Sequence, residues 1–114
     1  MRSLVVKLTA GADAPERCLQ GLTVAATARA AGAQVSLWLT GESVRLATPD
    51  GELELPESPP ASTLLDTLDQ VQVCTQCAAR RGLSQADLKP GITIAGAASF
   101  VEQVLAEGVQ ALVY

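Results

Sequence analysis

A length of 114 residues suits one hydrophobic core, and we expect a single domain over residues 1–114. Apolar residues make up 48% of the chain and aromatic residues only 3%, so this core must be packed from Val, Leu, Ile and Ala. The net charge is −4, and the eight Lys and Arg residues are spread along the chain. The sequence therefore lacks the concentrated basic patch that a nucleic-acid partner would require.

Signals for export and membrane insertion are not found in the sequence. The first apolar run, residues 4–6, is followed at once by Lys7 and is too short for a signal peptide, and no stretch reaches transmembrane length. Three cysteines form an odd count that does not indicate a disulfide framework. We therefore expect a cytoplasmic protein with no membrane partner. In that reducing compartment a C-x-x-C pair is more often redox-active, sulfur-handling or metal-binding than structural.

The amino-terminal third predicts a strand, a helix and a second strand. Residues 3–9 are an apolar, β-branched run typical of a buried strand. Asp13 is predicted to cap a helix that has Pro15 in its first turn, and apolar residues recur at helical spacing up to a stop at Gly32. Residues 34–40 predict the second strand.

The middle of the chain gives weaker signals. Residues 41–48 are compatible with a helical turn, and residues 52–56 alternate acidic residues with leucine, which predicts a minor strand or hairpin. The Ser-Pro-Pro run at 58–60 is expected to open a further helix, whose apolar face carries three leucines: Leu64, Leu65 and Leu68.

The carboxyl-terminal part predicts three more strands alternating with helices. The strands are expected at residues 70–73, 92–95 and 109–113, and the helices at 78–81 and 98–107. Alternation of strands and helices indicates parallel strands joined by right-handed crossovers, with helices on both faces. The predicted fold class is therefore α/β, a three-layer α/β/α sandwich with a mainly parallel sheet of about five strands.

Ligands of an open parallel sheet bind beyond the carboxyl ends of its strands. The loops at those ends carry the cysteine pair and four further residues that would line the rim of a pocket: Gly11, Asp13, Gly41 and Gly96. Asp13 and Glu42 could act there as acid or base, although Asp13 is better explained as a helix cap. The glycines are better explained by tight turns than by phosphate binding.

The pair Cys74 and Cys77 is the main candidate for chemistry. Cys74 would lie between a strand end and the first turn of a helix, where free N–H groups favour the thiolate. Arg80 and Arg81 would add positive charge, and no acidic residue occurs between positions 70 and 86. A local positive pocket in an acidic chain suits a thiolate or a persulfide.

Other residue types limit the alternatives. Cys18 falls on the apolar side of its helix and is interpreted as a core residue. The chain has no His, which removes Cys-His pairs and His metal sites. Two cysteines cannot complete a tetrahedral metal site within one chain, so no metal site is predicted. Metal binding ranks fourth among the hypotheses for function, because it would need ligands from oligomer contacts. No phosphate-loop or dinucleotide-binding motif occurs, and no cofactor is predicted.

The run from Val73 to Leu83 (VCTQCAARRGL) resembles the cysteine segment of the DsrE-like sulfur-relay family, and the likeness extends over nearly the whole chain. The resemblance implies a three-layer fold with a five-stranded, mainly parallel sheet, a cytoplasmic location and assembly as a homo-oligomer (trimer or hexamer). It also implies that Cys74, by position, accepts sulfane sulfur as a persulfide. The second cysteine, Cys77, is similar to the form found in small stand-alone members and permits an intramolecular disulfide.

The leading hypothesis for function is therefore a persulfide carrier. Cys74 would take sulfur from a donor and deliver it to an acceptor, these partners being proteins or small thiols, and Cys77 would act as the resolving thiol. A second hypothesis is thiol-disulfide exchange or peroxide handling by the same pair. A third is a non-enzymatic, oligomeric binding protein for a small anion.

Overall fold

The computed structural model describes residues 2–114 as a five-stranded parallel sheet covered by helices. The strands lie in the order β4-β3-β2-β1-β5, and every neighbouring pair is parallel. Their bounds are β1 Ser3–Leu8, β2 Gln34–Leu39, β3 Gln70–Cys74, β4 Thr93–Ala95 and β5 Val109–Val113. The prediction of an α/β fold with about five parallel strands is confirmed.

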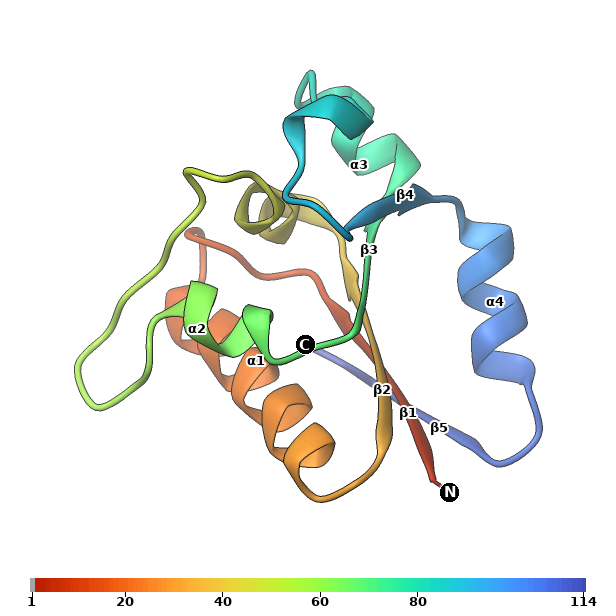
Figure 1. The fold of residues 1–114 in the computed structure, drawn as a ribbon. Helices are drawn as coiled ribbons and strands as arrows, with labels where there is room; N and C mark the ends of the chain where they lie inside the picture. The colour runs from red at the N-terminus through yellow and green to blue at the C-terminus, as the bar shows by residue number, and fades with distance from the viewer. Residues whose placement is uncertain (1) are drawn as a thin grey trace.

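The helices make the outer two layers (Figure 1). α1 (Pro15–Ala30) and α2 (Ala61–Asp66) lie on one face of the sheet, and α4 (Ala97–Leu105) lies on the other. α3 (Thr75–Arg80) is at the carboxyl edge of the sheet, near a 3-10 helix, η1 (Gly41–Ala47). A short 3-10 turn, η2 (Gln85–Asp87), precedes β4. No helix within residues 2–114 is long and apolar enough to cross a membrane.

The hydrophobic core fills the space between the sheet and α1. Successive strand residues point to opposite faces, and alternate positions such as Val6, Leu8, Leu37 and Val73 are fully buried on the α1 side. Cys18 of α1 is buried in the same cluster, as predicted, and burial together with the charge of Asp13 raises its pKa to about 11. This thiol is therefore inert at neutral pH.

The other face of the sheet has a polar layer under α4. The side-chain oxygen of Gln103 accepts hydrogen bonds from Ser36 Oγ at 2.8 Å and from Trp38 Nε1 at 2.9 Å. The same amide donates through Nε2 to Gln72 at 2.7 Å. Trp38 is 2% exposed, so its indole N–H needs this partner. Gln103 thus fixes α4 over the middle of the sheet.

Two predicted details are wrong. Ala14, not Asp13, stands at the cap position of α1, and Asp13 instead accepts a hydrogen bond from the Gly11 N–H at 2.8 Å. A side-chain cap is less needed here because Pro15, the first helical residue, has no N–H to satisfy. The expected strand or hairpin at residues 52–56 does not form. The Glu52 carboxylate and the Leu53 carbonyl instead bind N–H groups at the start of α2.

Candidate functional site

Cys74 is both the last residue of β3 and the residue that caps α3. It is paired with Ala95 at the end of β4. Because Val73 points into the core, alternation places the Cys74 side chain on the α4 face, at the carboxyl edge of the sheet. The sequence placed this residue correctly, since an apolar strand that breaks into a polar turn leaves its final side chain at that edge.

The surroundings of Cys74 favour its thiolate. Burial acts to raise the pKa of the half-buried thiol, but hydrogen bonds from the backbone and side chain of Cys77 and from the Gln76 N–H outweigh it. The positive charge of Lys7 acts in the same direction. The net effect is a pKa below the ordinary value of a cysteine, so more thiolate is present at neutral pH.

Cys77 lies one helical turn beyond Cys74, half-buried, and its thiol hydrogen-bonds to the Cys74 sulfur. Both cysteines are free. The side chain of Cys77 also packs against the hydrophobic core. The structure therefore brings the two predicted catalytic residues together as a contacting dithiol.

The two predicted supporting arginines are placed differently from one another. Arg81 Nε donates to Glu42 Oε1 at 3.0 Å, and its Nη1 donates to the Cys77 carbonyl at 3.1 Å. The Arg81 guanidinium, followed by that of Arg45, holds the pKa of Glu42 below its usual range. Arg80 is exposed. Arg81 thus ties α3 to η1, and its charge is already neutralised by a carboxylate.

The predicted rim residues split into two groups. Gly11 is buried against η1, where a Cβ atom would lie 2.7 Å from the backbone carbonyl of Glu42. Gly41 has a φ of 56°, and a Cβ there would lie 2.8 Å from the Thr9 carbonyl oxygen. These two glycines and the exposed Asp13 therefore shape the joint between the β1–α1 loop and η1. Gly96 is the one next to the cysteine loop, since Thr75 Oγ1 is the nearest atom to a Cβ built on it.

Lys7 is the residue near the site that sequence reasoning missed. It lies in β1 on the same face as Cys74, and its Nζ is 5.3 Å from the centroid of the Phe100 ring in α4. The signal was present in the sequence, because a single charged residue interrupts the otherwise apolar run of residues 4–8. Strand alternation alone assigns that residue to the face opposite Val6 and Leu8.

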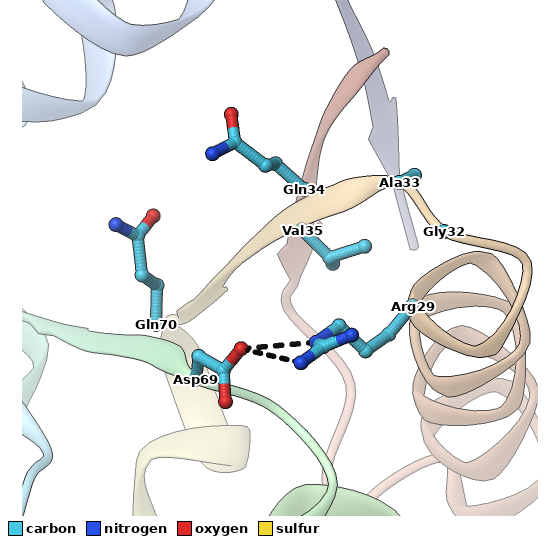
Figure 2. Close-up of a pocket in the computed structure, with 7 residues that line it drawn as sticks. All are labelled: Arg29, Gly32, Ala33, Gln34, Val35, Asp69 and Gln70. Carbon is cyan, nitrogen blue, oxygen red and sulfur yellow. Dashed lines mark hydrogen bonds and ion pairs between the residues drawn. The ribbon is translucent and has the colours of Figure 1, made fainter. Parts of the chain in front are cut away.

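A shallow cavity of about 290 Å³ lies at the opposite, amino-terminal edge of the sheet (Figure 2). The Arg29 guanidinium crosses it to the Asp69 carboxylate, with the Nη2–Oδ2 distance at 2.8 Å. Gln70, which also lines this cavity, is the first residue of β3, whereas Cys74 is the last. The cavity is therefore separate from the thiols. Within residues 2–114 no group of three or more His, Cys, Asp or Glu side chains gathers in a way that could hold a metal ion.

The fold and the site together define a three-layer α/β protein that presents an activated thiol at a strand-to-helix junction. The model of the DsrE/DsrF-like family matches residues 2–113, and the chain belongs to that family. The resemblance found in the sequence is thereby confirmed.

Solved structures of other proteins share this fold. The YchN protein of E. coli is 18% identical, with a TM-score of 0.78 over 98% of this chain and 100% of that one. A protein of unknown function from Methanobacterium thermoautotrophicum is 14% identical, with a TM-score of 0.78 over 100% of both chains. No curated protein matches the sequence. At these identities the likeness concerns the fold alone.

Proposed function

We propose that the protein is a sulfur-relay carrier that accepts sulfane sulfur on Cys74 as a persulfide and passes it on. The observation that carries the proposal is the hydrogen-bonded, partly exposed thiol at the end of β3, whose pKa is lowered by its neighbours. Membership of the DsrE/DsrF-like family supports the same chemistry. The reducing cytoplasm, which keeps both thiols free, is the compartment we assign to it.

The transfer step needs only a thiolate and a donor. The Cys74 thiolate attacks the outer sulfur of a donor persulfide, a new S–S bond forms, and the donor thiolate leaves with the electron pair of the broken bond. The N–H groups of Gln76 and Cys77, which favour the thiolate, also lie where they can stabilise the persulfide anion. An acceptor thiolate then removes the outer sulfur by the same displacement and restores Cys74.

Cys77 gives a second route of release. Its thiolate attacks the inner sulfur of the Cys74 persulfide, the Cys74–Cys77 disulfide forms, and the outer sulfur leaves as hydrosulfide. The outer sulfur is reduced while the two cysteines are oxidised, so a small thiol must then reduce the disulfide. The contact between the two thiols also favours a second candidate function, thiol-disulfide exchange without any bound sulfur.

Intact-mass spectrometry after exposure of the reduced protein to polysulfide separates these functions. We expect the mass to rise by about one sulfur atom in the wild type and in Cys77→Ser, to return with reductant, and to stay unchanged in Cys74→Ser. A wild-type chain that only loses two hydrogens, with no sulfur adduct on either variant, would instead establish disulfide exchange. Cys18 serves as the internal control, because its buried thiol should not react.

We also propose that the chain works as a homo-oligomer, a trimer or a hexamer. α4 has no buried residue although it is rich in apolar side chains. Four large hydrophobic residues of α4 and β5 are exposed: Val101, Leu105, Leu112 and Val113. Exposed apolar side chains on a helix and on the edge strand beside it are typical of a contact with another chain.

A further inference from the structure

Lys7 carries a positive charge that no carboxylate of the described chain neutralises. The ion pairs formed within residues 2–114 involve Arg29, Arg45 and Arg81, and Lys7 takes part in none of them. Arg81, whose Nη1 donates to the Cys77 carbonyl, is paired with Glu42. Arg80, the last residue of α3, forms no ion pair either, but it is exposed to solvent. Lys7 is half-buried, so it is the unpaired cation that is held on the sheet face of Cys74.

The sheet register places Lys7 and Cys74 on one face. Lys7 is level with Trp38 in β2, and Trp38 is level with Gln72 in β3. Cys74 is two residues beyond Gln72, so the two Cα atoms are separated by about 10 Å across the strands and about 7 Å along them. The four-carbon stem of lysine can cover part of this separation.

Aromatic contacts hold the Lys7 ammonium on the cysteine side. Its Nζ lies over the face of Phe100, 5.3 Å from the ring centroid, and Phe100 packs edge-on against Trp38 with centroids 5.4 Å apart. Phe100 is in the first turn of α4, which begins just after the strand that pairs with Cys74. A cation–π contact fixes the position of the ammonium while leaving its N–H groups free for an anion.

We propose that Lys7 is a specificity residue, which makes Cys74 select a small anionic sulfur donor of the thiosulfate class. This inference rests on the proposed function. In the step it assists, the Cys74 thiolate attacks the outer sulfur of thiosulfate, the bond to the sulfite sulfur breaks, and sulfite leaves with the electron pair. The step brings two anions together, and the Lys7 ammonium offsets their repulsion. Phe100 is a positioning residue for that ammonium.

Two alkylating agents that differ in charge test the electrostatic part without sulfur chemistry. In the Cys77→Ser chain, the rate of Cys74 alkylation by anionic iodoacetate is divided by the rate with neutral iodoacetamide. We expect Lys7→Gln to lower this ratio about fivefold and Lys7→Arg to preserve it. Raising the salt concentration should bring the wild-type ratio close to that of Lys7→Gln. Phe100→Leu should give an intermediate ratio.

Arg17→Gln is the matched control, since it removes one exposed positive charge from α1, on the opposite face of the sheet. It should leave the ratio unchanged. Persulfide formation from thiosulfate, followed by intact mass, should slow in Lys7→Gln and not in Arg17→Gln. A folded Lys7→Gln chain with an unchanged ratio and an unchanged thiosulfate rate would overturn the inference. A wild type that takes sulfur from neither thiosulfate nor polysulfide would instead overturn the proposed function. The alkylation ratio would still test whether the charge of Lys7 draws anions to Cys74.

Discussion

The pKa of Cys74 is lowered by groups that are close in the sequence and by one group that is distant. The N–H groups of Gln76 and Cys77 belong to the first turn of α3, which begins at Thr75. The sequence placed Cys74 before a helical turn, although it predicted helix only over residues 78–81. Lys7, whose charge also lowers the pKa of Cys74, lies in β1, which the strand order places two strands away from Cys74. Arg81 is close to Cys74 in the sequence, but its guanidinium is hydrogen-bonded to the Glu42 carboxylate. Proximity along the chain predicted the candidate thiol, but it did not show that Arg81 is paired with a carboxylate and that Lys7 is not.

The pH dependence of Cys74 alkylation tests the local part of this arrangement. A lowered pKa means that the iodoacetamide rate should reach half its plateau at a pH below that of an ordinary cysteine. Cys77→Ser replaces the thiol but retains both backbone N–H groups, so its midpoint should rise only part of the way back. A wild-type midpoint at or above the ordinary value would contradict the hydrogen-bonding account of Cys74.

At the scale of elements, most strands and helices followed from periodicity. The strands of the core sheet are β-branched or leucine-rich, and α1 has Pro at its start and Gly32, with a φ of 98°, just after its end. The failures lie where a tertiary partner decides the structure. Residues 52–56 alternate like a strand, but they bond to the start of α2 and not to a neighbouring strand. Alternation alone cannot show whether a free strand edge is within reach.

The joint between the β1–α1 loop and η1 gives a prediction about stability. Gly11→Ala would place a Cβ atom 2.7 Å from the Glu42 carbonyl, on backbone that cannot move aside cheaply, so we expect a loss of about 1–3 kcal/mol. Gly96→Ala is the matched control, since the nearest atom to its Cβ is 3.9 Å away. Denaturant unfolding of both variants measures the difference. Equal stability would show that the joint is not tightly packed.

On the scale of the whole molecule, the two faces of the sheet are covered unequally. The α1 face holds the continuous hydrophobic core, whereas α4 contributes no buried residue and rests on a polar layer centred on Gln103. Leu105 is 78% exposed and Val113 64%. β5 is also an edge strand of the sheet. An edge strand and an apolar helix side by side are the features that a second copy would cover.

Assembly is therefore expected to depend on the surface of α4 and β5. Sedimentation velocity of the wild type should show a trimer or a hexamer, and the double variant Leu105→Lys with Val113→Asp should shift the protein toward monomer. Glu16→Lys, an exposed charge change on α1, should leave the assembly intact. A wild type that is monomeric at high concentration would contradict the proposed homo-oligomer.

The sequence alone determined the parallel α/β architecture and the position of Cys74 at a strand end, because both depend on local periodicity and on residues that start and stop helices. It also identified the family, because the cysteine run is a contiguous motif. Only the tertiary structure decided which positive charges are paired with a carboxylate and which apolar surface stays exposed. Arg81 meets Glu42 and Lys7 meets Phe100 across elements far apart in the chain, and such pairings are set by strand order rather than by spacing.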